Sequence, residues 1–164
     1  MVSREVTNVQ EVLSQFRRFS KALIDASSII YMQKAGFFME LASSLNLYSL
    51  QEILAETGFG DLKINRLACN STSLPNDQKF IACALVHRFP VISEDKKILS
   101  HMKKEKIPYF NALMMLNFLL FRERISVKSY SMYFERLKHF AWYSSYVLEF
   151  SIDIYSAILK ERNK

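Results

Sequence analysis

Short apolar runs alternate with helix-like patterns of apolar residues along most of the chain. Three of these runs predict buried strands, at residues 21–24, 45–48 and 90–92, and residues 107–110 predict an edge strand. The runs lack the apolar–polar alternation of strands with one face in water, and helical patterns separate them. The sequence therefore predicts an α/β fold, with a central parallel β-sheet of four to five short strands flanked by helices on both faces.

The spacing of apolar residues and the capping residues predict the helices. The segment Ser73-Leu74-Pro75-Asn76-Asp77 combines a capping residue, a proline and an acid, which is typical of a helix start. The predicted helices are 6–19, 28–44, 49–56, about 75–88, a basic helix after residue 95, and three apolar stretches in the C-terminal part. With no repeat and no flexible linker, we expect one domain, 1–164, with a core at about 21–125 and a C-terminal helical extension at about 126–161.

The composition argues against several classes of protein. Half of the residues are apolar, and there are only three glycines, three prolines and two cysteines, which disfavours disordered and fibrous chains. The longest nearly apolar run, 109–121, is shorter than the roughly 20 residues that span a bilayer, so we expect a buried helix and no membrane. The first residues lack the apolar run of a signal peptide, and two cysteines cannot form a disulfide framework, so we expect a reducing, cytoplasmic location.

The positive charge is concentrated in the C-terminal part of the chain. The formal net charge is +6; residues 1–95 contain 9 basic and 10 acidic side chains, whereas residues 96–164 contain 13 basic and 6 acidic ones. A basic C-terminal part beside a slightly acidic N-terminal part is consistent with a protein that binds a polyanion. The alternative is a surplus of surface lysines that only keeps the protein dissolved.

Acidic side chains follow two of the predicted strands. Asp25 ends the first strand, and Asp95 comes shortly after the 90–92 strand. Neighbouring parallel strands deliver the residues at their carboxyl ends to one crevice, for which Asp77 and Glu52, on helices, are further candidates. Carboxylates in one crevice repel one another, and Mg²⁺ or Mn²⁺ resolves that repulsion. The alternative is that each acid separately caps a helix or faces solvent.

Four short motifs around these acids resemble the PIN domain of metal-dependent nucleases. They are Leu23-Ile24-Asp25-Ala26-Ser27, Leu50-Gln51-Glu52-Ile53, Asn76-Asp77-Gln78-Lys79-Phe80-Ile81-Ala82 and Val91-Ile92-Ser93-Glu94-Asp95-Lys96-Lys97. Each motif is short, and their common order and spacing over roughly residues 21–125 make the resemblance.

The resemblance implies a parallel sheet sandwiched by helices and an acidic site that holds one or two Mg²⁺ or Mn²⁺ ions. The residues at the family's catalytic and metal-binding positions are Asp25, Glu52, Asp77 and Asp95. Glu56 and Glu40 are the alternatives to Glu52. The implied reaction is hydrolysis of RNA phosphodiester bonds, commonly by the toxin of a toxin–antitoxin pair, so an antitoxin protein is an expected partner.

Polar neighbours and basic residues are expected to support this site. The residues expected to orient the ligands or to hydrogen-bond a phosphate oxygen are Ser27, Ser93 and Glu94. Lysines at helical spacing after residue 95, expected to hold the nucleic-acid backbone, are Lys96, Lys97, Lys103 and Lys104. A solvated helix face is the alternative. A second candidate basic patch consists of Arg122, Arg124 and Lys128.

Two further features have ordinary structural interpretations. Cys83 and His87 are four residues apart on one predicted helix, but without a second pair at zinc spacing we favour a core cysteine and a helix-end histidine. The segment 142–159 has aromatic and aliphatic residues at helical spacing and is expected to pack on the body, with a homodimer or a partner helix as the alternative. The sequence thus supports two hypotheses: a metal-dependent ribonuclease, and a non-catalytic protein on the same scaffold that binds nucleic acid or another protein.

Overall fold

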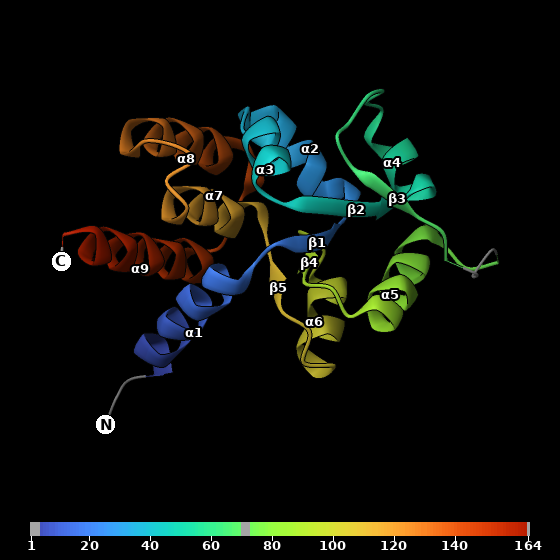
Figure 1. Cartoon of the computed structure of the whole chain (residues 1–164), viewed down its shortest axis with the longest axis horizontal. Coiled ribbons are helices and arrows are strands. Elements are labelled where there is room, and N and C mark those ends of the chain that lie inside the picture. Colours follow the sequence, from blue (N-terminus) through green and yellow to red (C-terminus); the bar gives the residue numbers. More distant parts are fainter. Residues whose placement is uncertain (1–3, 70–72, 164) are drawn as a thin grey trace.

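A computed structural model describes residues 4–69 and 73–163, with side chains from residue 8 onward, and it confirms the α/β fold (Figure 1). The strands are β1 (Lys21–Ile24), β2 (Asn46–Leu50), β3 (Asn65–Leu67), β4 (Val91–Ile92) and β5 (Tyr109–Phe110). The helices are α1 (Arg4–Arg18), α2 (Ala26–Ala35), α3 (Phe38–Ser44), α4 (Gln51–Thr57), α5 (Asn76–His87), α6 (Lys96–Lys104), α7 (Ala112–Phe121), α8 (Val127–Ala141) and α9 (Ser145–Arg162). The strands form one sheet in the order β3-β2-β1-β4-β5, and every pairing is parallel.

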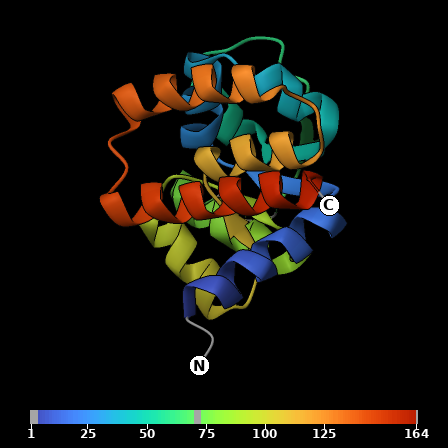
Figure 2. The ribbon, with the colours of Figure 1, turned by 90° about the vertical axis from the view of Figure 1, so that its left-hand side faces the viewer.

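Helices cover both faces of the sheet. Along β1, the side chains of Ala22 and Ile24 join the larger core, and Leu23 joins the smaller one, because successive residues of a strand point to opposite faces. Helices α1, α2, α3, α7, α8 and α9 pack into the larger core, while α5 and α6 pack into the smaller one. Figure 2 shows α7 between α8 and α9, with α1 beside α9. The predicted flanking helices and the edge position of β5 are thus confirmed.

The apolar run at 109–121 forms β5 and the buried helix α7, as predicted. One of its two asparagines, Asn117, is fully buried and hydrogen-bonded: its Nδ2 donates to Ser151 Oγ (2.8 Å), and the hydroxyl of Tyr130 donates to its Oδ1 (2.9 Å). A buried amide with partners on two helices favours one arrangement of those helices. Asn117 therefore fixes α8 and α9 against α7. Among the described residues, no helix is long and apolar enough to cross a bilayer.

The single helix predicted at 28–44 is two helices in the structure. Gly36 ends α2 in the left-handed conformation (φ 98°), and its N–H donates to the carbonyl of Met32 (2.8 Å). This is the usual way in which glycine terminates a helix, because it has no Cβ to clash at positive φ. α3 then starts in a new direction after the break.

The second strand and the helix after it also lie later than predicted. Ser49 and Leu50 belong to β2, not to α4: they pair with Arg66 and Leu67, and the Ser49 hydroxyl donates to the carbonyl of Ile24 (2.7 Å). Their partner strand β3 was missed by the sequence pattern, because it is short and carries exposed polar side chains at Asn65 and Arg66. The pairing with β2 makes this segment a strand.

Candidate functional site

The order of the strands creates a crevice between β1 and β4. From β1 the chain builds the sheet outward on one side through β2 and β3, and it then returns to place β4 on the other side of β1. α2, which follows β1, packs mainly into the larger core, whereas α6, which follows β4, packs into the smaller one. In parallel sheets, ligands bind at such a switch point, beyond the carboxyl ends of the strands.

A pocket of about 650 Å³ lies at this position. Because Ile24 pairs with Ile92, the residues that follow these two strands emerge side by side. The pocket's acidic lining residues are Asp25, Glu56, Asp77, Glu94 and Asp95. Three of the four predicted site acids therefore share one pocket, and Glu52 is the one that does not.

Asp25 lies at the centre of the hydrogen bonds in the pocket and is only 8% exposed. It caps α2 by accepting from the N–H of Ala26 (2.9 Å), and its Oδ2 accepts from the hydroxyls of Ser93 (2.9 Å) and Ser27 (3.3 Å). Burial raises the pKa of Asp25 above its usual range, the three hydrogen bonds oppose that rise, and the negative charge of Glu56 adds to it. The predicted orienting roles of both serines are supported by these contacts.

Asp95 is both a helix cap and a pocket residue. Its Oδ1 accepts from the N–H of Lys97 (2.8 Å) at the start of α6, and its own N–H donates to Ser93 Oγ (3.0 Å). Ser93 therefore connects the loop of Asp95 to the carboxylate of Asp25. The capping alternative from the sequence is correct for both aspartates, and it does not remove them from the pocket.

The prediction of Glu52 as the pocket glutamate is wrong. Glu52 is exposed in the first turn of α4, whereas Glu56, one turn later, lines the pocket and accepts from Nδ2 of Asn76 (2.6 Å). The end of α4 approaches the start of α5, so the glutamate one turn earlier is about 6 Å too far along the helix. The other alternative, Glu40, lies outside the pocket and contacts the hydroxyl of Tyr133. Asp77 is exposed at the rim.

Glu94 connects the site to the surrounding helices. Its carboxylate accepts from the hydroxyl of Ser28 on α2, from the N–H of Ala112 at the start of α7 (3.0 Å) and from the hydroxyl of Tyr143 (2.6 Å). Burial raises the pKa of Glu94, and the hydrogen bonds from these groups oppose the rise. Both of its oxygens accept hydrogen bonds, so Glu94 joins the pocket to α2, to α7 and to the segment between α8 and α9. No local pattern in the sequence indicates partners this far apart.

Among the residues that the structure describes, the acids of the pocket have no basic partners. The lining contains no lysine or arginine, and the ion pairs among the described residues involve the other acids Glu161, Glu135 and Glu123. At the same time, no three described acids bring carboxylate oxygens within 4.8 Å of one another. Mg²⁺ keeps several of its own waters in protein sites, so a few loosely spaced carboxylates are a suitable donor set for it.

The basic residues divide into a surface row and a structural group. On α6, Ile98 and Met102 are buried and the four lysines are exposed, as predicted. Arg122, in contrast, is not part of a free basic patch, because its guanidinium donates to the carbonyls of Phe16 and Phe19 (3.0 Å each) and caps the end of α1. The second predicted patch is therefore reduced to Arg124 and Lys128, both exposed.

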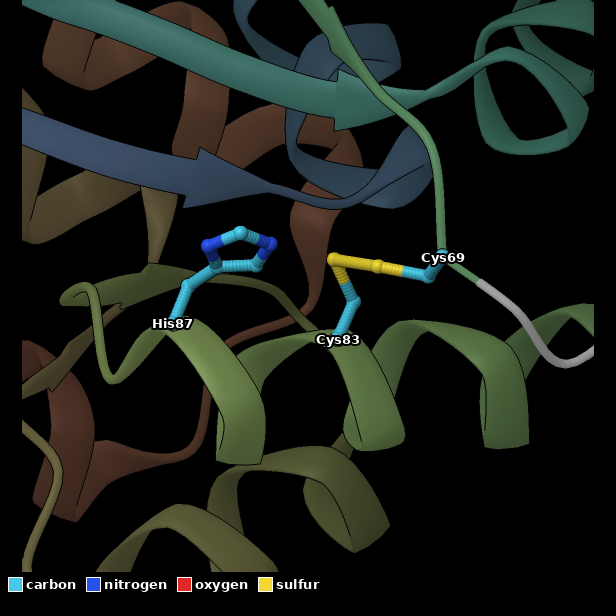
Figure 3. Close-up of side chains that lie close together, drawn as sticks. All are labelled: Cys69, Cys83 and His87. Atoms are coloured by element: carbon cyan, nitrogen blue, oxygen red, sulfur yellow. A yellow bond between two sulfur atoms is a disulfide. The ribbon is translucent and has the colours of Figure 1, made fainter.

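The two cysteines are joined in a disulfide, which the expectation of a reducing location did not anticipate. Cys69 follows β3, and Cys83 is buried on α5; their Cα atoms are 5.9 Å apart (Figure 3). His87 is the last residue of α5, the helix-end position that was predicted. Its ring points toward the same sulfur atoms.

Comparisons with models of protein families, with curated proteins and with solved structures found no match to this chain. The chemistry of the pocket residues is therefore the basis for assigning a function.

Replacing Asp25 by asparagine is expected to raise the melting temperature of the metal-free protein, and the gain should grow as the pH rises from about 4 toward neutrality. Because burial raises the pKa of Asp25 above 3.8, the folded protein holds this proton more firmly than the unfolded chain. That stabilisation is present below the ordinary pKa and is lost as the pH rises through the raised value. Asparagine stays neutral and still caps α2.

Thermal melts in chelator across this pH range test the expectation. Asp153→Asn, the same change at an exposed position of α9, is the control and should give a flat difference. A difference between Asp25→Asn and wild type that is independent of pH would contradict the raised pKa.

Proposed function

We propose that this protein is a PIN-type endoribonuclease that hydrolyses RNA phosphodiester bonds with Mg²⁺ or Mn²⁺. The observation that carries the proposal is a pocket at the switch point of a parallel sheet, lined by five carboxylates and, within the described part of the chain, by no lysine or arginine. Like charges gathered without a basic partner are costly unless a cation neutralises them. Burial raises the pKa of Asp25 in the metal-free protein, and the negative charge of Glu56 adds a smaller rise.

The position of each pocket residue indicates its role in metal binding. Asp25 and Asp95, which follow β1 and β4, would hold the ion, and Glu56 and Asp77, on the facing helices, would hold its bound waters or a second ion. Ser93 fixes the orientation of Asp25 through its hydroxyl. A bound divalent ion supplies two things to phosphodiester hydrolysis: it lowers the pKa of an attacking water and offsets the charge that develops on the phosphate.

The α6 lysines are suited to hold the substrate. α6 begins at Asp95, so Lys96 and Lys97 lie in the turn next to the pocket, and Lys103 and Lys104 continue the exposed face. Such a row binds the phosphate backbone without reading its sequence. The proposal therefore takes RNA of varied sequence as the substrate class. The proposed location, the cytoplasm, is where such a substrate is found.

Within this proposal, the protein is the toxin of a toxin–antitoxin pair. The C-terminal segment packs on the body through Ile154 and Ile158, as expected, but Trp142 is 88% exposed and Tyr146 is 68% exposed. Exposed aromatic side chains are enriched at binding surfaces. An antitoxin segment, or a second copy of this chain, is the proposed occupant.

Cleavage of RNA by the purified protein tests the proposal. A panel of labelled single-stranded RNAs is incubated with Mg²⁺, with Mn²⁺ or with chelator, and we expect endonucleolytic products only in the presence of metal. RNA binding that persists in chelator, with no cleavage in either metal, would overturn the proposal and favour the non-catalytic alternative.

Glu56→Gln is expected to weaken Mn²⁺ binding about tenfold, whereas Glu52→Gln is expected to leave it unchanged. The two glutamates are one turn apart on α4, and only Glu56 lines the pocket. The pair is thus a matched test of the geometry, measured by calorimetric titration of Mn²⁺ into each variant. Equal losses in the two variants, or a larger loss for Glu52→Gln, would contradict the placement of α4 against the pocket.

A further inference from the structure

We infer that Cys69, Cys83 and His87 form a second metal site, specific for a thiolate-binding ion such as Zn²⁺, when the disulfide is reduced. Each of the three residues offers a ligand atom, and these atoms all lie within 4.8 Å of one another. They are the one group of three or more histidine, cysteine or acidic side chains in the described part of the chain that meets this condition. Two sulfurs and an imidazole are the ligands that Zn²⁺ prefers.

The backbone already holds the three residues in place. Cys83 and His87 are four residues apart on α5 and so project from the same side of the helix, while Cys69 comes from the segment after β3 (Figure 3). The His87 ring packs on Phe89 (5.3 Å between centroids), and it makes no hydrogen bond to another residue that the structure describes. Its nitrogens are therefore available as ligands.

The distances that zinc requires fit this arrangement. With Zn–S of about 2.3 Å and Zn–N of about 2.0 Å at tetrahedral angles, the sulfurs are roughly 3.8 Å apart and each is roughly 3.6 Å from the nitrogen. Each of these separations is shorter than the 4.8 Å that already encloses the three ligand atoms. Once the disulfide is open, rotation of the side chains suffices, and the fourth position is left for water or another small ligand.

The oxidation state of the Cys69 and Cys83 sulfurs determines whether they form a disulfide or bind a metal ion. Reduction by a phosphine adds two electrons to the disulfide; the phosphine becomes its oxide, and water supplies the oxygen and the two thiol protons. A cellular thiol does the same by exchange and becomes a disulfide itself. Zn²⁺ then replaces the two thiol protons, which pass to solvent. Exchange with a small-molecule disulfide reverses the process: that disulfide takes up the two electrons and two protons and becomes two thiols, the Cys69–Cys83 bond forms again, and the ion is released.

The zinc site is separate from the acid pocket. Both involve α5, but Asp77 lies in its first turn and His87 at its last residue, which places them about 15 Å apart along the helix axis. The ligands also differ in kind: the pocket offers carboxylate oxygens, which suit Mg²⁺ and Mn²⁺, and this site offers sulfur and nitrogen. Its occupation is thus independent of the proposed nuclease activity.

Zinc titration of the full-length protein tests the inference. The phosphine-reduced protein, freed of reductant, competes with a chromophoric chelator for Zn²⁺, and Co²⁺ serves as the spectroscopic probe. We expect one tightly bound ion, a thiolate-to-Co²⁺ charge-transfer band, and an affinity at least about 100-fold higher than in the disulfide form, in which both sulfur ligands are lost. Equal affinity in the two forms would overturn the inference.

Variants identify the ligands. Cys69→Ala should abolish the charge-transfer band, and His87→Ala should weaken Zn²⁺ binding at least about tenfold. His101→Ala, on the exposed face of α6, is the matched control, and Asp25→Asn should bind Zn²⁺ at this site as wild type does. Because Cys83 is buried, its role is tested in the wild-type protein, where bound Zn²⁺ should protect both thiols from alkylation. Normal zinc affinity in Cys69→Ala or in His87→Ala would contradict the assignment.

Discussion

Asp25→Asn abolishes metal-dependent RNA cleavage if the pocket is the active site. The asparagine keeps the Oδ1 acceptor for the N–H of Ala26, so α2 remains capped. It removes the charge of the most buried aspartate of the pocket, and with it the ligand that Ser93 holds in place. Losing even an outer-shell partner of a metal commonly costs 10–100-fold, so we expect the cleavage rate to fall by at least about 100-fold.

The measurement is initial cleavage rate at saturating Mg²⁺ and Mn²⁺, with circular dichroism to verify the fold. Asp153→Asn makes the same chemical change on exposed α9 and should retain wild-type activity. If folded Asp25→Asn cleaves RNA at the wild-type rate, the activity lies elsewhere, even if the wild-type protein is a nuclease.

Glu94→Ala is expected to lower the free energy of unfolding by about 3 kcal/mol, because each buried hydrogen-bonding group left without a partner costs about 1–3 kcal/mol. The groups left without an acceptor are the Ser28 hydroxyl, the Ala112 N–H and the Tyr143 hydroxyl. Removing a carboxylate whose pKa is raised by burial returns part of that energy, but three donors remain unpaired. These donors lie on α2, on α7 and between α8 and α9. The loss in free energy of unfolding therefore affects the packing of several helices of the larger core.

Urea denaturation followed by circular dichroism measures this effect. Tyr143→Phe removes one of the three hydrogen bonds and should cost about 1 kcal/mol. Glu149→Ala, on the exposed side of α9, should change the free energy by less than about 0.5 kcal/mol. A loss below about 1 kcal/mol for Glu94→Ala would mean that this carboxylate does not hold the helices together.

Local signals in the sequence located the parts of the site that local structure determines. Asp25 and Asp95 each follow a buried apolar strand, and a parallel sheet delivers both to one edge wherever the rest of the chain goes. Ser27 and Ser93 lie in the same two motifs as these aspartates and were predicted with them. The α6 lysines followed from helical spacing alone, since Ile98 and Met102 had to face the core.

Residues whose position depends on packing between distant elements escaped the sequence pattern. Glu52 and Glu56 have the same helical environment, and only the approach of α5 to the end of α4 makes Glu56 the pocket residue. The role of Glu94 depends on partners 66, 18 and 49 residues away. Cys69 lies close to Cys83 because β3 pairs with β2, and the sequence of β3 has no apolar run that would predict a strand.

Anomalous scattering from Mn²⁺ tests the central claim most directly, because it locates the ion independently of any RNA. Crystals of the protein grown with Mn²⁺ should show a strong anomalous peak bonded to Asp25 and to at least one of Asp95, Glu56 and Asp77. Crystals that contain saturating Mn²⁺ but show no peak in this pocket would contradict the account.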